Sequence, residues 1–366
     1  MGRVRVLIVD DSALVRRLLQ EVLSSEQDIE VVGTASNAAI ALSRIETLSP
    51  DVVTLDIEMP DMSGLELLAE IRKRAPKLPV IMFSSLTQRG AATTLDALAL
   101  GATDYVTKPT GASSREAALE QVRTQLVPKL RVLAPRAPPG MERLNAAQRR
   151  ERVSFGETQR VSVLAVGCST GGPNALAEIF GRLSCALAAP VLIVQHMPPL
   201  FTRMLADRLG ASGPLRVREA SHGDVLTPGG VWIAPGDFHM RVERQGLSTV
   251  IALDKGPPEN SCRPAVDVLF RSVAEVYGER ALALVLTGMG QDGLRGAEAI
   301  HARGGRIIAQ DEASSVVWGM PGAVVRAGLA GSVLPLQEIA DDVTRRVGSS
   351  PAFGASRLNQ EGRRVG

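Results

Sequence analysis

The sequence predicts an α/β protein of two domains, each built on a parallel β-sheet with helices on both faces. Three observations support this. Short apolar runs alternate with segments that have apolar residues at helical spacing, a proline-rich stretch interrupts the alternation, and the alternation resumes after residue 160. Such alternation is typical of parallel sheets that are buried on both faces. A chain of 366 residues is also long enough for two cores.

The first domain is predicted to span residues 1–122. Its strands are expected where short runs are rich in valine, isoleucine and other apolar residues. The expected strands are Val4–Val9, Ile29–Thr34, Val52–Asp56, Val80–Ser84 and Tyr105–Thr107. The expected helices between and after them include Ala13–Leu23, Leu65–Arg74, Thr93–Ala99 and Glu116–Leu126.

Residues 123–159 are predicted to be a linker, because consecutive prolines after residue 134 fit neither a helix nor a central strand. A second domain is predicted for residues 160–348, followed by a disordered polar tail, 349–366. Its expected strands are Val161–Val166, Val191–Gln195, Val231–Ala234, Ala281–Leu286 and Arg306–Ala309. Its expected helices include Ala175–Arg182, Ala265–Tyr277 and Arg295–Ala302.

The composition argues against several classes of function. A formal net charge of +2 gives no global reason to expect a nucleic acid or an anionic membrane as partner. The sequence has no apolar run of roughly 18 residues and no signal-peptide pattern, so we expect no membrane insertion. The three cysteines, Cys168, Cys185 and Cys262, have no metal-ligand spacing and fit a reducing compartment. A cytoplasmic protein is therefore expected.

Carboxylates occur at the ends of two predicted strands of the first domain. Asp10 and Asp11 follow the first strand, and Asp56 ends the third. The carboxyl ends of parallel strands share one edge of the sheet, so these three groups should meet there. Such a cluster needs a cation, for which Mg²⁺ is the natural choice. With Ser84 and Lys108 at the same edge, the set suits phosphoryl transfer to an aspartate. The alternative is that Asp11 and its neighbour merely cap a helix.

The same residues resemble the receiver domain of two-component response regulators. The matching positions, in order, are Asp10-Asp11, Asp56, Met59-Pro60, Gly64, Ser84 and Lys108-Pro109. This resemblance implies a flavodoxin-like fold and phosphorylation of Asp56 by a histidine kinase. It also implies that Asp10, Asp11 and Asp56 hold Mg²⁺ with help from the Glu58 carbonyl. The switch residues that it implies are Ser84, Tyr105 and Lys108.

In the second domain, a glycine-rich turn follows the first predicted strand and precedes a helix. Its sequence, GCSTGGP from Gly167 to Pro173, contains the G-x-S-x-G pattern of a nucleophile elbow. The turn would expose Ser169 and leave backbone N–H groups at a helix N-terminus, where they can hold an oxyanion. A phosphate-binding loop is an equally acceptable interpretation of this motif alone.

A serine nucleophile needs a base and a carboxylate. His196 follows the strand next in sequence, and Asp292 follows the strand Ala281–Leu286. The order Ser169, His196, Asp292 differs from that of α/β-hydrolases, but triads are defined by geometry. Of the other histidines, His301 lies in a helical segment. A metal site built from His222 and His239 with Asp224 or Asp237 is an alternative.

A rival motif overlaps the proposed acid. Gly288–Gly293 satisfies G-x-G-x-x-G after a strand, and Asp311 and Glu312 lie about 20 residues further on, as in a dinucleotide-binding fingerprint. This interpretation leaves Ser169 and His196 without a role, and such a motif normally opens its domain.

Longer motifs resemble the catalytic domain of the chemotaxis protein-glutamate methylesterase family, CheB. They are GCSTGG from Gly167, QHM from Gln195, RPAVD from Arg263, TGMGQDG from Thr287 and DEASSVVWGMP from Asp311. The resemblance, which spans most of the chain, implies a doubly wound, Rossmann-like sheet.

The functional expectations follow from that resemblance. Ser169 would attack glutamate γ-methyl esters on chemoreceptors, His196 would act as the base and Asp292 would orient it. The backbone N–H groups of Thr170 and Met289 would hold the oxyanion, and the ester step would need no cofactor. Methanol would be released, and receptor glutamines would be deamidated by the same machinery. The unphosphorylated receiver is expected to cover this site. A response regulator without enzymatic activity and a nucleotide-dependent enzyme are the alternatives.

Overall fold

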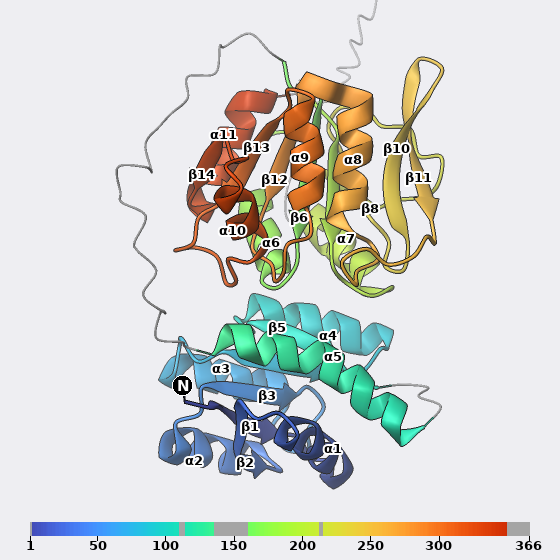
Figure 1. Cartoon of the computed structure of the whole chain (residues 1–366). Helices are drawn as coiled ribbons and strands as arrows, with labels where there is room; N and C mark the ends of the chain where they lie inside the picture. The colour runs from blue at the N-terminus through green and yellow to red at the C-terminus, as the bar shows by residue number, and fades with distance from the viewer. Residues whose placement is uncertain (1, 110–113, 135–159, 212–214, 350–366) are drawn as a thin grey trace, which may run out of the picture.

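The structure, a computed structural model, describes residues 2–109, 114–134, 160–211 and 215–349. Both predicted domains are present and each is α/β. The first is built on a five-stranded sheet, and the second on a seven-stranded sheet with an additional two-stranded sheet (Figure 1). The prediction of fold class is therefore confirmed.

The first sheet is entirely parallel, in the order β2-β1-β3-β4-β5. Its strands are β1 (Val4–Val9), β2 (Ile29–Ala35), β3 (Val52–Asp56), β4 (Val80–Ser84) and β5 (Asp104–Thr107). The helices are α1 (Ala13–Ser24), α2 (Ala38–Leu48), α3 (Gly64–Arg74), α4 (Gln88–Ala99) and α5 (Arg115–Leu133). All residues of β3 and β4 are buried, as expected of central parallel strands.

Side-chain caps define where the helices of this domain begin. The residues before α1 to α5 are Ser, Asn, Ser, Thr and Ser, and each accepts a hydrogen bond from a backbone N–H of its helix. At α1 the cap is Ser12, whose hydroxyl accepts from the Val15 N–H. The helix N-terminus that the sequence offered at Asp11-Ser12 is therefore present, and Ser12 is the residue that caps it.

Helix α5 is longer than the sequence indicated. It continues through Leu133, past residue 122, where we predicted that the linker begins. Val122, Leu126 and Leu130 are fully buried against the first sheet, so apolar residues at helical spacing keep the helix in place despite Pro128. The remaining linker residues, 135–159, and the predicted tail after residue 349 lie outside the described residues.

The large sheet of the second domain is also parallel, in the order β14-β13-β12-β6-β7-β9-β8. Its strands are β6 (Val163–Cys168), β7 (Val191–Gln195), β8 (Arg216–Glu219), β9 (Gly230–Ile233), β12 (Ala281–Val285), β13 (Arg306–Gln310) and β14 (Ser332–Leu334). The chain extends the sheet from β6 in one direction and later returns to add β12 on the other side. The switch point between β6 and β12 is where parallel sheets commonly bind ligands.

Helices cover this sheet on both faces, and a hairpin flanks it (Figure 1). The helices are α6 (Gly172–Arg182), α7 (Phe201–Ala211), α8 (Val266–Tyr277), α9 (Leu294–Ala302), α10 (Met320–Arg326) and α11 (Leu336–Val347). The hairpin joins β10 (His239–Gln245) to β11 (Ser248–Asp254). The carboxyl ends of the strands of the large sheet face α4, β5 and α5 of the first domain (Figure 1). The two domains therefore meet at the edge where β6 ends, directly before Ser169.

Candidate functional site

The acidic cluster of the first domain forms as the sequence indicated. Carboxylate oxygens of Asp10, Asp11 and Asp56 all lie within 4.8 Å of one another. Asp10 and Asp56 are each 1% exposed, whereas Asp11 is exposed. Lys108 Nζ lies 2.7 Å from Asp56 Oδ1 and 3.7 Å from Asp10 Oδ2. The cluster therefore combines buried negative charge with one cation at the end of β5.

The electrostatics of this cluster favour a bound cation. Burial and the neighbouring Asp56 charge raise the pKa of Asp10 to about 6, and burial likewise raises the pKa of Asp56. Burial lowers the pKa of Lys108, but its hydrogen bond to Asp56 and the charges of the three aspartates together outweigh this effect and raise the pKa. Asp10 Oδ2 and Asp56 Oδ2 are buried and lack a hydrogen-bond partner among the described residues. Converging carboxylate oxygens that lack a hydrogen-bond donor fit a hard cation such as Mg²⁺.

The residues implicated in switching lie between the acidic cluster and the second domain. The Ser84 hydroxyl is buried against α4, where it donates to the Gly90 carbonyl at 3.2 Å and accepts from Thr94 at 2.7 Å. Tyr105 stacks on Phe201, the first residue of α7, with ring centroids 4.9 Å apart and planes 4° from parallel. Ser84 thus contacts α4, and Tyr105 contacts the second domain directly.

Strand pairing places Ser169 and His196 side by side. Cys168 at the end of β6 pairs with Gln195 at the end of β7, and Ser169 and His196 are the next residues. The Ser169 N–H donates to the Thr287 carbonyl at 3.0 Å, which ties the turn to the end of β12. Gly171 completes the turn with a φ of +78°, a conformation that favours glycine.

The segment after β12 also approaches Ser169 closely. A Cβ at Gly288 would lie 2.9 Å from the Ser169 Cβ, closer than real Cβ atoms approach, so a side chain at position 288 would displace Ser169. The backbone N–H groups of Thr170 and Met289, which flank this contact, have no hydrogen-bond partner among the described residues. Both are therefore available to a ligand at Ser169.

The half-buried His196 and the buried Asp292 form a hydrogen-bonded pair. His196 Nε2 lies 2.8 Å from Asp292 Oδ2. The Asp292 carboxylate also accepts from the N–H groups of Val266 and Asp267 at the start of α8, at 2.7 and 3.0 Å. Burial raises the pKa of Asp292, but these hydrogen bonds, with that of His196 first, lower it below its ordinary value. Burial lowers the pKa of His196, but the Asp292 and Cys262 contacts outweigh it and raise it.

The other nitrogen of the His196 ring faces a thiol. Cys262 Sγ lies 3.5 Å from His196 Nδ1. The Ser169 hydroxyl forms no hydrogen bond within the described ranges, so a contact from Ser169 to His196 is not made in this arrangement. Catalytic hydrogen bonds often form only when substrate binds. Because Asp292 occupies Nε2, Nδ1 is the nitrogen left for the serine proton.

Sequence reasoning missed two residues that hold this site together. The Gln195 side-chain amide donates to the carbonyls of Ser169 and His196, at 3.0 and 3.3 Å, and so links the two turns. The Thr287 hydroxyl donates to the Thr170 carbonyl at 2.9 Å. Both side chains are buried. Gln195 ends β7 and Thr287 follows β12, and a polar residue at a strand end is the sequence signal that could have identified them.

The alternative sites are not assembled. Asp311 accepts hydrogen bonds from the Ser314 N–H and hydroxyl, at 2.9 and 2.6 Å, and so closes a local turn. His239 bonds to the Pro257 carbonyl, and His222 accepts from the Leu253 N–H. In the part of the chain that the structure describes, no metal-ligand group forms from these histidines with Asp224 or Asp237.

Receiver residues touch the turn that carries Ser169. The Thr170 hydroxyl donates to Asp104 Oδ2 at 2.8 Å, and the same carboxylate oxygen lies 2.7 Å from Lys129 Nζ. Val317 shares a buried cluster with residues of the first domain, and Met289 packs against that cluster. The segments around the nucleophile are therefore held against β5 and α5.

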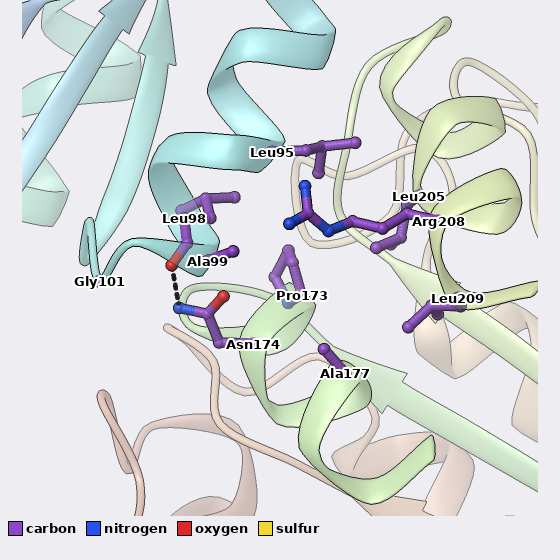
Figure 2. Close-up of a pocket in the computed structure, with 10 residues that line it drawn as sticks. All are labelled: Leu95, Leu98, Ala99, Gly101, Pro173, Asn174, Ala177, Leu205, Arg208 and Leu209. Atoms are coloured by element: carbon purple, nitrogen blue, oxygen red, sulfur yellow. Dashed lines mark hydrogen bonds between the residues drawn. The ribbon is translucent and has the colours of Figure 1, made fainter. Parts of the chain in front are cut away.

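Helix α4 makes the second set of contacts between the domains. The Asn174 amide donates to the Leu98 carbonyl at 2.8 Å, and Arg208 pairs with Asp96 at 2.8 Å. A cavity of about 460 Å³ lies between α4, α6 and α7. Figure 2 shows leucines from α4 and α7 among the residues that line it. The cavity marks incomplete packing, so this part of the interface is less tightly closed than the β5 contacts.

Comparisons with known proteins identify both domains. The CheB methylesterase family model matches residues 164–343, and the response regulator receiver domain model matches residues 6–120. The protein-glutamate methylesterase/protein-glutamine glutaminase of Trichodesmium erythraeum is 48% identical, with 95% of this chain and 100% of that protein covered. This chain belongs to the CheB methylesterase family. The receiver match precedes the methylesterase match along this chain. Our domain boundaries of 1–122, 123–159, 160–348 and 349–366 stay predictions.

Further relatives have similar names. The protein-glutamate methylesterase/protein-glutamine glutaminase of a Nocardioides species is 49% identical, with 95% of this chain and 96% of that protein covered. A crystal structure of the Thermotoga maritima CheB methylesterase catalytic domain is 43% identical, with a TM-score of 0.49, and covers 50% of this chain and 97% of that one. No helix among the described residues is long and apolar enough to cross a bilayer.

Proposed function

We propose that this protein is a phosphorylation-regulated serine hydrolase that demethylates glutamate γ-methyl esters on chemoreceptors in the cytoplasm. The observation that carries the proposal is the 2.8 Å hydrogen bond between His196 and Asp292, at the sheet edge where Ser169 follows β6. A nucleophile, a base and an orienting carboxylate are the parts that acyl transfer requires. The names of the relatives supply the substrate class.

The ester step uses only groups of this chain. Ser169 Oγ attacks the γ-carbonyl carbon, and His196 Nδ1 accepts the hydroxyl proton after the Ser169 side chain has replaced the Cys262 contact. The N–H groups of Thr170 and Met289 donate to the oxyanion. When the tetrahedral intermediate collapses, the carbon–oxygen bond to the methoxy group breaks and His196 protonates the departing methanol.

Deacylation repeats these steps with water. His196 removes a proton from water, the resulting hydroxide attacks the acyl-serine, and Ser169 leaves as a protonated hydroxyl. The products are a receptor glutamate and the free enzyme. A receptor glutamine follows the same route, with ammonia in place of methanol, so deamidation needs no additional residue.

Phosphorylation of Asp56 is proposed as the control. Asp10, Asp11, Asp56 and the Glu58 carbonyl would hold Mg²⁺, which neutralises phosphoryl charge while a histidine kinase or a small donor supplies the group. Lys108 already contacts Asp56 and would pair with the phosphoryl oxygens. Ser84 and Tyr105 would then rearrange, and Tyr105 would leave Phe201. Loss of the Tyr105–Phe201 contact would weaken the β5 contacts that hold the receiver over Ser169.

The test is methanol release from methylated chemoreceptors in membranes. The unaltered protein should release methanol, and Ser169→Ala should reduce release by at least about 10³-fold, because the nucleophile is lost. Ser162→Ala, on the amino-terminal side of β6 and away from the turn, is the matched control. If Ser169→Ala releases methanol at the unaltered rate, the serine mechanism is wrong.

A further inference from the structure

A tight turn contacts both His196 and Asp292. Glu259 and Cys262 exchange both backbone hydrogen bonds, at 3.0 and 2.9 Å, around Asn260 and Ser261. The two central residues have φ values of 52° and 62°, which defines a two-residue turn of the primed type. Asparagine tolerates this left-handed conformation well. The turn therefore fixes the direction in which the Asn260 side chain leaves the backbone.

The Asn260 amide joins two buried carboxylates. Its Nδ2 donates to Asp292 Oδ1 and to Asp267 Oδ2, each at 2.9 Å. Asp267 is 1% exposed and Asp292 is 2% exposed. An amide nitrogen carries two hydrogens, so each carboxylate receives one. Without this donor, two buried negative charges would face each other with one fewer hydrogen bond apiece.

Ion pairing secures the turn to the helix that also binds Asp292. Arg271 of α8 donates to both carboxylate oxygens of Glu259, at 2.7 and 2.6 Å. The start of α8 donates two N–H groups to Asp292. At the other end of the turn, Cys262 contacts His196 Nδ1. The turn therefore contacts both His196 and Asp292, and it is held to α8, the helix whose N–H groups bind Asp292.

We propose that Asn260 is a positioning residue that keeps the Asp292 carboxylate aligned with His196 while holding Asp267 beside it. This inference rests on the proposed function, because alignment matters only if His196 is the base. Asn260 does not touch the reacting atoms. Its amide fixes Asp292 Oδ1, which leaves Oδ2 directed at His196 Nε2.

The charged groups around the pair determine the pH signature. Glu259 and Cys262 come from the turn, Asp267 and Arg271 from α8, and Asp292 from the loop after β12. Burial raises the pKa of Asp267, while its hydrogen bonds to Gly296 and Asn260 oppose this rise. If the amide is removed, the Asp292 carboxylate attracts the His196 proton more strongly. The low-pH limb of the rate profile, on which His196 loses its proton, should then move to higher pH.

The test compares Asn260→Gly, Asn260→Asp and Ser261→Gly in the full-length protein with a phosphodonor. Glycine keeps the positive φ, so Asn260→Gly removes the amide but not the turn. For Asn260→Gly we expect kcat to fall by about tenfold and KM to change by less than about twofold. The midpoint of the low-pH limb should shift upward by roughly half a pH unit. Ser261→Gly, whose side chain is exposed, is the matched control. If Asn260→Gly matches Ser261→Gly in kcat and pH profile, the proposal is overturned.

Asn260→Asp gives a distinct signature. The new carboxylate cannot donate when ionised, but it can donate when protonated. Its activity relative to the unaltered protein should therefore improve as the pH falls, whereas a structural defect would give a ratio independent of pH. A constant ratio would contradict the positioning role.

A measurement without substrate separates this inference from the proposed function. The chain has four histidines, so the His196 imidazole can be assigned and titrated by NMR. Asn260→Gly should shift that titration upward, and Ser261→Gly should not, whether or not methanol is released. Absence of methanol release with a shifted titration would reject the esterase and keep the positioning role. An unshifted titration would reject the positioning role.

Discussion

The two sheets carry their candidate reactive groups at equivalent topological positions. In the five-stranded sheet the chain changes direction between β1 and β3, and Asp10 and Asp56 lie there. In the seven-stranded sheet the change falls between β6 and β12, and Ser169 and Asp292 lie at the ends of these strands or shortly after them. Parallel strands present their carboxyl ends at such a point, with space between the connecting segments.

The two sites differ in the number of separate structural elements that form them. The acidic cluster consists of residues at strand ends and one lysine after β5, so it forms as soon as the small sheet does. The second site depends on Gln195, on the start of α8 and on the turn at Asn260, and the receiver contacts it at Thr170. A site built from several separate elements can be controlled from a distance, because each of these elements must be correctly placed for the site to work.

The largest effect is expected for Asp292→Asn. The amide preserves volume but cannot accept from His196 while also satisfying the N–H groups of α8, so the ring loses its correct tautomer. We expect kcat for methanol release to fall by about 10⁴-fold. Mg²⁺-dependent phosphorylation of the receiver should be unaltered. Loss of both activities would show that the sites are not separable.

A thiol reagent should come next in effect. Cys262 is half-buried beside His196 Nδ1, whereas Cys168 is fully buried and burial raises its pKa. N-ethylmaleimide at Cys262 would place an adduct at the base nitrogen and reduce methanol release by at least about 100-fold. The activity of Cys262→Ala should resist the reagent. Equal sensitivity of that variant would assign inactivation to another cysteine.

A smaller change is expected at the domain interface. Thr170→Val removes the donor to Asp104 but keeps the backbone N–H of residue 170, so basal activity should rise by about fivefold as the receiver contact weakens. Asp96→Ala breaks an ion pair whose carboxylate side chain is 60% exposed and should change basal activity by less than about twofold. A larger rise in basal activity for Asp96→Ala than for Thr170→Val would place the controlling contact at α4.

The last expected effect concerns stability and not activity. Asp10 has a folded-state pKa of about 6, above its ordinary value of 3.8, so the folded protein binds more protons than the unfolded chain between these values. Stability from this group is therefore lost as pH rises from about 4 to 6. At pH 7 without Mg²⁺, Asp10→Asn should increase the free energy of unfolding by on the order of 1–2 kcal/mol. Thermal unfolding with and without Mg²⁺ checks this, and Mg²⁺ should stabilise only the unaltered protein.

Much of this architecture could be predicted from the sequence, because buried parallel strands have a strong local signal. β1, β3, β4 and β7 begin and end where the apolar runs do. Helices α2 and α7, the hairpin of β10 and β11, and the last two helices were not predicted. Buried and exposed residues alternate along only part of β10, and β11 has three consecutive buried residues, so the hairpin has a weak sequence pattern.

The candidate sites divide in the same way. Asp10, Asp11, Asp56 and Lys108 could be placed together from strand ends alone. Ser169, His196 and Asp292 could be placed at one edge, but the contacts of Asn260 and Cys262 could not. The sequence does not indicate which residues the turn between β11 and α8 contacts. Those contacts depend on how α8 packs against the large sheet, which places the turn.

The measurement that most directly tests control of one site by the other is methanol release by the unaltered protein and by Asp56→Asn, each with and without acetyl phosphate and Mg²⁺. We predict that the phosphodonor stimulates the unaltered protein and leaves Asp56→Asn at its basal rate. Thr170→Val combined with Asp56→Asn should keep its raised basal rate. Equal stimulation of the unaltered protein and Asp56→Asn would contradict the account.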